Sequence, residues 1–212
     1  ILIKPDAYNH IGKIIDALLS EGLFISKLRM AFMDKTLSQH FAQVSCGGNT
    51  QVFKKSMQML AEDVSVGIEI FGENAVGILN ALCGPLNPSR AKENSPNSFS
   101  ALYGSDAVKN AVYCTPDESD TDLVKFFSNT QHSSVLDNCT CCVIKPHCLT
   151  DGTAGKIIDM ILSNGFEISA MGLFQLKPND AKEFFEYSWS KFPHYKELLN
   201  HMTQGPCLAL EV

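Results

Sequence analysis

The pentapeptide Gly12-Lys13-Ile14-Ile15-Asp16 occurs again as Gly155-Lys156-Ile157-Ile158-Asp159, displaced by 143 residues. The tripeptide Ile3-Lys4-Pro5 likewise returns as Ile144-Lys145-Pro146, displaced by 141 residues. Two looser repeats keep almost the same displacement: Gly22–Ser26 with Gly165–Ser169, and Ile68–Ile70 with Leu210–Val212. Because four blocks recur in the same order at nearly one spacing, they indicate a duplicated domain, and the period is far too long for a solenoid.

A polar stretch over residues 128–134 separates the two copies. It has no apolar periodicity and is rich in serine, which is typical of a linker. We therefore predict a first copy over residues 1–127, a linker over 128–137 and a second, shorter copy over 138–212. Since the chain begins and ends in strand-like segments, we expect both ends to be cuts through a longer protein.

The spacing of apolar residues predicts helices and strands in both copies. Apolar residues from Ile11 to Leu19 follow the period of a helix, and Gly22 suits the position just beyond its end. In copy one we predict further helices and strands, with strands over 1–4, 23–33 and 64–71, helices over 37–44, 52–60, 74–82, 106–111 and 119–127, and an irregular loop over 85–96. In copy two we predict strands over 139–145, 166–176 and 206–212 and helices over 154–163, 179–190 and 194–203. Such alternation indicates α/β layers.

The composition excludes several classes of protein. With 45% hydrophobic residues among 212, the chain can bury a core and is not disordered. No apolar run reaches the roughly 18–20 residues that span a bilayer, and a net charge of −6 argues against general nucleic-acid binding. Cys139, Cys141, Cys142 and Cys207 lie in apolar, strand-like runs, so we expect reduced thiols rather than disulfides. The run from Cys139 to Cys148 lacks the spacing of a metal site, and we predict no metal there.

Several blocks together resemble the nucleoside diphosphate kinases. In copy one these blocks are Ile3–Ala7, Gly12–Ile15, Cys83–Pro88 and Asn110–Tyr113. In copy two they are Asn138–His147, Gly165–Met171 and Gly205–Glu211, which look like the second kinase domain of the tandem-domain, seventh-type branch of the family. The resemblance covers nearly the whole chain, and the order of the blocks makes it specific.

The resemblance implies a fold and a reaction. The family fold is a ferredoxin-like α+β plait, a four-stranded antiparallel sheet with helices packed on it, so we expect two such domains, the second incomplete. The family's reaction moves the γ-phosphate of a nucleoside triphosphate to a histidine and then to a nucleoside diphosphate, with Mg²⁺ and ATP in the site. A histidine suits this relay because neutral imidazole is nucleophilic near pH 7. A purely structural protein would require neither nucleotide nor Mg²⁺.

The family's site residues carry over only in part. Lys4 matches the phosphate-contacting lysine, Asn110 the asparagine near the nucleotide sugar, and Lys145 the lysine of the second domain. The nucleophile position, three residues after Asn110, holds Tyr113, and an alternative register that starts at Tyr103 also supplies a tyrosine. The positions of two family arginines and of a neighbouring threonine hold other residues, namely Ser100, Asn80 and Leu86. None of the six histidines occupies the nucleophile position, and tyrosine, with a pKa of about 10, is a poor phosphoryl relay at neutral pH.

Simpler structural roles compete with these assignments. Lys4 and Lys145 could end their strands at a solvated edge. His147, which stands where the family usually has aspartate, could be a turn residue, and Tyr113 could fill the space left by the missing imidazole.

Three functions follow from these alternatives. The first, which the missing histidine and arginines favour, is structural: an eroded kinase-like module with no catalytic residue of its own. As the resemblance implies, it would bind tubulin and neighbouring proteins of the ciliary or flagellar doublet microtubule, in the axonemal cytoskeleton of the cytoplasm, with no membrane partner. The second is phosphotransfer through a histidine in a part of the protein not shown, and the third is nucleotide binding without turnover. We also expect the two copies to pair as an intramolecular pseudo-dimer.

Overall fold

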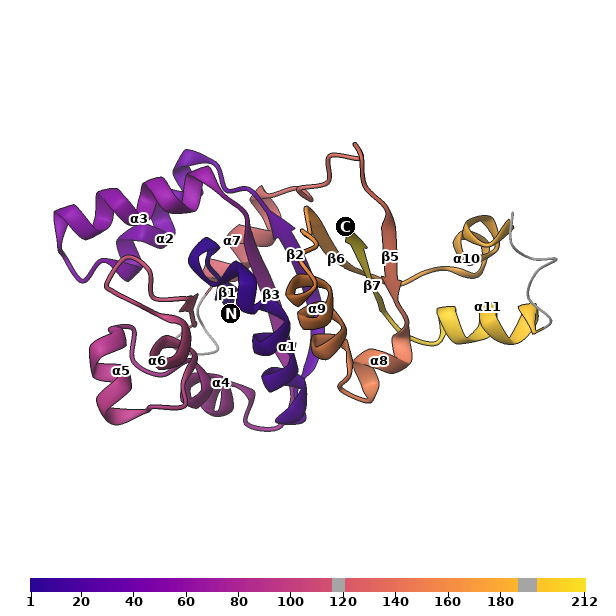
Figure 1. Ribbon diagram of the computed structural model, residues 1–212, viewed down its shortest axis with the longest axis horizontal. Helices are drawn as coiled ribbons and strands as arrows, with labels where there is room; N and C mark the ends of the chain where they lie inside the picture. The colour runs from indigo at the N-terminus through magenta and orange to yellow at the C-terminus, as the bar shows by residue number, and fades with distance from the viewer. Residues whose placement is uncertain (116–120, 187–193) are drawn as a thin grey trace.

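The computed structural model describes residues 1–115, 121–186 and 194–212. Within these ranges the strands form one seven-stranded sheet in the order β4-β1-β3-β2-β6-β7-β5, and every neighbouring pair is antiparallel (Figure 1). Copy one supplies four strands: β1 (Leu2–Ile3), β2 (Phe24–Ala31), β3 (Ser65–Phe71) and β4 (Val112–Tyr113). Copy two supplies three: β5 (Cys141–Ile144), β6 (Ala170–Phe174) and β7 (Cys207–Glu211).

Helices connect and cover these strands. In copy one they are the 3₁₀ helix η1 (Pro5–His10), α1 (Ile11–Ser20), α2 (Lys35–Ser45), α3 (Thr50–Glu62), α4 (Ala75–Cys83), α5 (Pro88–Asn94), α6 (Phe99–Tyr103) and α7 (Asp122–Asn129). In copy two they are α8 (Pro146–Thr150), α9 (Ala154–Ser163), α10 (Pro178–Phe184) and α11 (Tyr195–Thr203). Helices α10 and α11 project away from the sheet beyond β5 (Figure 1).

The predicted plait of antiparallel strands and packed helices is confirmed, with one difference in how the sheets are organised. The four strands of copy one and the three of copy two form a single sheet, because the edge strand β2 pairs with the edge strand β6 through Arg29 and Gly172. Pairing the two edges satisfies backbone groups that an isolated edge strand would leave open to other chains.

Two local predictions are wrong. Residues 106–111 do not form a helix, because the Asp106 carboxylate accepts the backbone N–H groups of Val108 (2.7 Å) and Lys109 (2.9 Å) in a tight turn. The irregular loop predicted over 85–96 contains helix α5, which begins where the Asn87 side chain accepts backbone N–H groups and Pro88 occupies the first turn. Helix α7 also extends to residue 129, into the predicted linker. Of the helix predicted over 179–190, residues 187–190 lie outside the described residues.

A local twofold relation joins the copies. Arg29 on β2 faces Gly172 on β6, and these two residues occupy equivalent positions in the repeat. On one side of the sheet α1 crosses α9 closely enough that a methyl group on Gly12 would lie 2.3 Å from the backbone nitrogen of Asp159. The reciprocal contact is equally tight, at 2.3 Å from Gly155 to the nitrogen of Asp16. The repeated pentapeptide is therefore the two halves of one self-complementary contact.

The linker packs across this junction. Ser133 donates its hydroxyl to the backbone oxygen of Ser169 at 2.6 Å. The Glu211 carboxylate accepts the backbone N–H groups of Val135 (2.8 Å) and Leu136 (3.0 Å). On the copy-one side, the Arg29 guanidinium donates to backbone oxygens of Phe127 and Thr130. The linker is thus held by side chains of both copies.

Two hydrophobic clusters stabilise the fold. The larger lies between the sheet and the crossed helices α1 and α9, and both copies contribute to it. The smaller belongs to copy one and lies beneath α2, α3 and α7; its buried members are Leu2, Ala31, Met33, Leu37, Phe41, Ala42, Leu60, Tyr113, Leu123 and Phe126. Among the described residues, no helix is long and apolar enough to cross a lipid bilayer.

Candidate functional site

Lys4 lies at the end of β1 and is 1% exposed. Its ammonium donates to the side-chain oxygen of Asn110 at 2.5 Å and to the Ser45 hydroxyl at 3.4 Å. Asn110 in turn donates its side-chain N–H to the backbone oxygen of Leu86 at 3.2 Å. The structure therefore brings together the two copy-one residues that the sequence singled out, and their polar atoms bind one another and nearby protein groups.

Burial governs the electrostatics around Lys4. It lowers the pKa of the Lys4 ammonium to about 8, against the opposing attraction of Asp6. Burial likewise raises the pKa of Asp6, although the Ala111 N–H, which donates to that carboxylate at 2.8 Å, and Lys4 both act to lower it. Ala111 adopts a positive φ of 67°, which aims its N–H at Asp6. Lys4 and Asp6 are thus linked only by their electrostatic attraction, and each makes its hydrogen bonds with other groups.

Tyr113, which the resemblance assigns to the family's nucleophile position, is buried and hydrogen-bonded. Its hydroxyl donates to the Asp122 carboxylate at 2.7 Å, and its ring meets Phe41 edge-on at 5.4 Å. Asp122 also lies 2.5 Å from His40 Nε2 and accepts from the Lys125 ammonium at 3.1 Å. Burial acts to raise the pKa of Asp122, but hydrogen bonds from Tyr113, His40 and Lys125 outweigh it and lower that pKa. The carboxylate is therefore ionised at neutral pH and fixes the tyrosine hydroxyl.

The alternative register puts its tyrosine elsewhere in the fold. Tyr103 lies in α6 and stacks on His10, with 4.4 Å between the ring centroids. The three positions that the resemblance assigns to lost family residues hold no positive charge. Asn80 is exposed and accepts from the Cys114 thiol at 3.3 Å, Leu86 is exposed, and Ser100 is buried.

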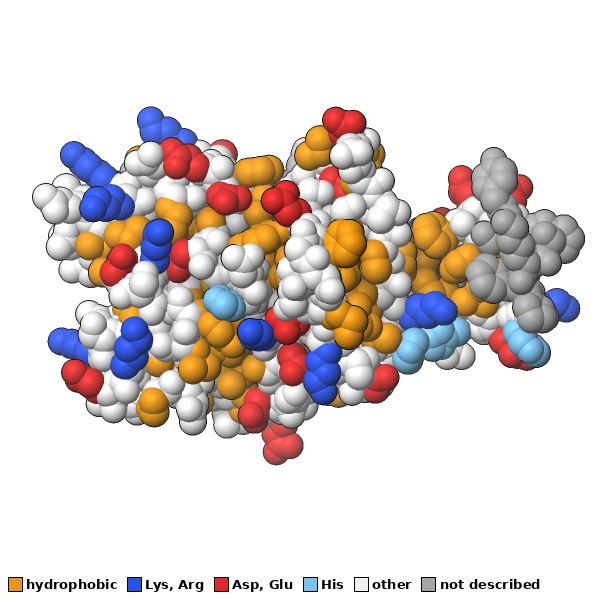
Figure 2. All heavy atoms as spheres, in the orientation of Figure 1, with side chains coloured by type: hydrophobic (Ala, Val, Ile, Leu, Met, Phe, Trp, Pro, Cys, Tyr) orange, Lys and Arg blue, Asp and Glu red, His pale blue; other side chains and the backbone are white. Residues whose placement is uncertain are grey.

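Copy two presents its lysine differently. Lys145 precedes α8, and its side chain is exposed. The neighbouring His147, also exposed, lies 2.9 Å from His201 of α11, measured from Nδ1 to Nε2. Histidine side chains gather at the base of the projecting α10–α11 arm (Figure 2). His147 therefore joins this arm to the body of the protein. A residue that only formed a turn would not make this contact.

Four residues of the copy-one site were not identified from the sequence. They are Asp6, His40, Ser45 and Asp122. Asp6 had a signal, since it follows the repeated Ile3-Lys4-Pro5 block by one position. The others had none, because each reaches its partner across a separation in sequence that no local pattern records.

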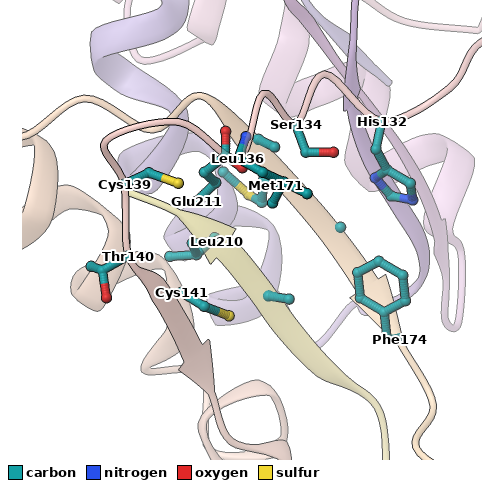
Figure 3. Close-up of a pocket in the computed structure, with 13 residues that line it drawn as sticks. His132, Ser134, Leu136, Cys139, Thr140, Cys141, Met171, Phe174, Leu210 and Glu211 are labelled. Carbon is teal, nitrogen blue, oxygen red and sulfur yellow. The ribbon is translucent and has the colours of Figure 1, made fainter.

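A separate hollow of about 430 Å³ lies on copy two, where the linker crosses β5, β6 and β7 (Figure 3). At one end His132 stacks on Phe174, with 5.2 Å between ring centroids, and the thiols of Cys139 and Cys141 lie at the other end. Lys4 does not line it. Over the described ranges, His, Cys, Asp and Glu side chains form no group of three or more that could hold a metal ion.

The family model for nucleoside diphosphate kinase matches residues 1–131 and again residues 138–212. The chain belongs to the nucleoside diphosphate kinase family. It is 30% identical over 218 residues to nucleoside diphosphate kinase homolog 7 of Rattus norvegicus. The match covers the whole of this chain. The match covers 55% of that relative, so the chain spans about half the length of the curated relatives it matches.

Solved nucleoside diphosphate kinases share the fold. The Aquifex aeolicus enzyme superposes with a TM-score of 0.52 at 27% identity, over 59% of this chain and 90% of the enzyme. The enzyme from Encephalitozoon cuniculi gives a TM-score of 0.51 at 22% identity, over 64% of this chain and 92% of the enzyme, and shows the fold alone.

Nucleoside diphosphate kinases use Mg²⁺ and nucleotides, but the copy-one residues that the resemblance assigns to phosphate contacts do not fit a bound nucleotide phosphate as the structure places them. Such a phosphate needs cationic donors that can reach it. The ammonium of Lys4 is buried against Asn110, and Asn80, Leu86 and Ser100 carry no charge. We therefore derive no step of phosphate transfer through copy one of this nucleoside diphosphate kinase homologue.

Proposed function

We propose that this chain is a catalytically inactive, tandem kinase-like module that acts as a binding block on the ciliary or flagellar doublet microtubule. One observation carries the inactive part: the lysine that should meet phosphate is 1% exposed and bound to Asn110 at 2.5 Å. The residue at the nucleophile position supports it, because the Tyr113 hydroxyl already donates to Asp122.

Transfer of phosphate would need more than a small rearrangement. The Tyr113 hydroxyl would have to lose its proton near neutral pH, beside an ionised carboxylate that disfavours a second negative charge. Lys4 would have to leave Asn110, which would leave a buried amide oxygen without its donor. A fold can outlast its catalytic site, since activity depends on particular residues rather than on the scaffold.

The proposed binding to microtubules is supported by the similarity to known relatives and by an exposed apolar surface. The chain is similar to nucleoside diphosphate kinase homolog 7 along its whole length, and that branch is the one we associate with the cilium. Phe24 and Phe71 are 50% and 56% exposed and stack on each other at 5.3 Å. With Leu149 and Pro206 they border a hollow of about 390 Å³, an apolar surface through which an acidic module could contact tubulin.

Calorimetric titration with ADP and Mg²⁺ tests the closed site. We expect no heat of binding up to millimolar nucleotide in the wild-type chain or in Lys4→Ala. Micromolar binding that Lys4→Ala abolishes would contradict the proposal, because it would show that Lys4 is available to phosphate.

Co-sedimentation with axonemal doublets tests the partner. We expect the chain to pellet with doublets and the double variant Phe24→Thr/Phe71→Thr to remain in the supernatant. The matched control is Val124→Thr, which alters a hydrophobic side chain that is 57% exposed on α7 and should pellet like the wild type. A wild-type chain that does not pellet would remove the microtubule proposal without affecting the closed site.

A second candidate function concerns copy two. Lys145 is exposed, so this lysine is available to a phosphate if a longer protein supplies a histidine and the remaining site residues. In that case the longer protein should take up acid-labile phosphate from labelled ATP, Lys145→Ala should reduce the uptake, and Lys4→Ala should not. Uptake that is insensitive to Lys145→Ala would exclude this role for Lys145.

A further inference from the structure

Two cysteines lie near Asn80, one at the end of α4 and one directly after β4. Cys83 is the last residue of α4 and is 3% exposed, and Cys114 directly follows β4 and is half-buried. The Cys114 thiol donates to the side-chain oxygen of Asn80 at 3.3 Å. Because Asn80 and Cys83 are three residues apart on one helix, they lie on the same face. Cys114 is thus placed against the last turn of α4, and both cysteines pack into the same hydrophobic cluster.

The electrostatic environment agrees with this contact. Burial raises the pKa of the Cys83 thiol, and the neighbouring Cys114 thiol raises it further. Cys83 is therefore protonated and shielded at neutral pH, whereas Cys114 is the member of the pair that solvent can reach. Since an oxidant must reach the sulfur, and burial disfavours the reactive thiolate form of Cys83, peroxide should modify Cys114 first.

We propose that Cys83 and Cys114 form a reversible intramolecular disulfide under oxidation by a peroxide. In the first step the Cys114 thiol gives up its proton, its sulfur attacks one oxygen of hydrogen peroxide, and the O–O bond breaks. A sulfenic acid forms on Cys114, and the hydroxide that leaves takes up the proton as one water. In the second step the sulfur of Cys83 attacks the sulfur of Cys114, the S–O bond breaks, and the hydroxide released takes up the proton of Cys83 as a second water. The two thiols lose two electrons in total, and the peroxide gains them.

The bond would act on the region of the former kinase site. Helix α4 carries Asn80, and β4 carries Tyr113, so a bond from Cys83 to Cys114 ties together the two segments that hold these residues. The link closes the loop between residues 83 and 114, which restricts the unfolded chain and stabilises the native one. This inference goes beyond the proposed function and does not depend on it, because it concerns only the chemistry of the thiols.

Mild treatment of the folded chain with hydrogen peroxide tests the proposal. We expect an intact mass lower by two hydrogens, a peptide map that links Cys83 to Cys114, and reversal by dithiothreitol. Cys114→Ser should abolish the link. The double variant Cys139→Ser/Cys141→Ser, which removes two exposed thiols, should keep it. Oxygen added to Cys114 with no link to Cys83, or a link only between Cys139 and Cys141, would overturn the proposal.

Thermal unfolding gives a second measurement that does not require a Cys83 variant to fold. The oxidised wild-type chain should unfold at a higher temperature than the reduced chain, and Cys114→Ser should show no such difference. Cys46→Ser, which removes a buried thiol elsewhere in copy one, should retain it. An equal effect of peroxide on Cys114→Ser and wild type would contradict the disulfide.

Discussion

The two copies carry the same lysine after the same strand, in different surroundings. Lys4 of copy one is buried and bonded to Asn110 across a separation of 106 residues. Lys145 of copy two is exposed, and the repeat over residues 138–212 does not extend to the segment that would correspond to Asn110. The repeated motif sets the backbone in both copies. What the lysine can do depends on segments far along the chain that cover it.

The opposite face of the sheet shows the same contrast. Gly67 of β3 lies beneath Phe126 of α7, so closely that a methyl group at Gly67 would be 2.5 Å from the ring. Its counterpart in the repeat is Ala209 of β7, which lines the hollow of about 430 Å³. The segment that would correspond to α7 lies outside residues 138–212, so the equivalent strand of copy two borders a hollow, and glycine is needed only where the ring of Phe126 approaches.

A serine–glutamate pair is repeated as well, with a different third partner. Ser26 donates to Glu69 at 2.6 Å and Ser169 donates to Glu211 at 2.6 Å. In copy one Glu69 adds an exposed ion pair with Lys27, whereas in copy two Glu211 holds backbone N–H groups of the linker. The same pair is a surface feature in one copy and an attachment point in the other.

The largest expected effect comes from disrupting the reciprocal contact between α1 and α9, which relates the two copies. Gly12→Ala and Gly155→Ala each place a methyl group 2.3 Å from a backbone nitrogen, so each should lower the free energy of unfolding by about 3 kcal/mol. The two losses should be similar because the contacts are reciprocal. Denaturant unfolding measures them, with Gly205→Ala as control, since its added carbon would meet Pro146 at an ordinary 3.4 Å. A large difference between the two variants would show that the helix crossing is not symmetric.

The next effect separates the two lysines. Lys4→Met should cost about 1–3 kcal/mol of stability, because it leaves the buried oxygen of Asn110 without its donor. Lys145→Met, at an exposed position, should change stability by less than about 0.5 kcal/mol. Equal losses in the two variants, measured by urea unfolding at pH 7, would show that burial does not distinguish the lysines.

The pH dependence of stability gives a further test of the burial of Lys4. The pKa of Lys4 is lowered in the folded state to about 8 from 10.5. Between these values the unfolded chain binds a proton at Lys4 that the folded chain has released, so stability due to this group rises with pH across that window. Wild type should therefore gain stability relative to Lys4→Met from about pH 8 to about pH 10.5. Parallel curves for the two proteins would contradict the assigned pKa.

A smaller effect tests how the nucleophile position is held. Tyr113→Phe removes the hydroxyl that donates to Asp122 and should cost about 1 kcal/mol at pH 7. Because the pKa of Asp122 is lowered in the folded state, the stability it contributes is present above its unfolded pKa and is lost as the pH falls through its folded pKa. The difference between wild type and Tyr113→Phe should therefore shrink in acid. A difference that is constant down to pH 2 would separate the tyrosine from the carboxylate.

The smallest effect distinguishes the two glutamates. The pKa of Glu211 is lowered, first by the Ser169 hydroxyl and then by the Val135 N–H. Glu211→Gln should weaken the hydrogen bonds that the Glu211 side chain accepts from the linker, and should speed hydrogen exchange at the amides of Val135 and Leu136. Glu69→Gln, the matched change in copy one, should leave both amides unaffected. Unchanged protection in Glu211→Gln would mean that other contacts hold the linker.

Much of the fold could be predicted because its signals are local. Helix α9 occupies the predicted residues 154–163, and Gly22 adopts the positive φ of 76° that its position after α1 requires. The helix predicted over 106–111 is wrong because one carboxylate, Asp106, satisfies the backbone N–H groups that a helix would need. Helix α5 was missed although Asn87 and Pro88 are a recognised start signal, because the surrounding prolines favoured a loop.

The candidate site could be predicted only as a set of residues. Lys4, Asn110 and Tyr113 were identified from their places in ordered motifs, and the structure places Lys4 against Asn110. Their partners Ser45 and Asp122 were not identified, because they come from helices whose own sequence patterns report only an apolar face. The catalytic roles assigned to these positions, and the assignment of Lys145, stay predictions that the titration and phosphate-labelling experiments test.

The sequence by itself determined the duplication and the order of most helices and strands, because each follows from residues close together or from blocks at a fixed displacement. Only the tertiary structure decided that β2 and β6 join the copies in one sheet, that Lys4 is buried, and that Tyr113 donates to Asp122. These outcomes depend on contacts between distant segments. Whether a charged side chain reaches water or a partner follows from what packs over it, and a strand motif does not contain that information.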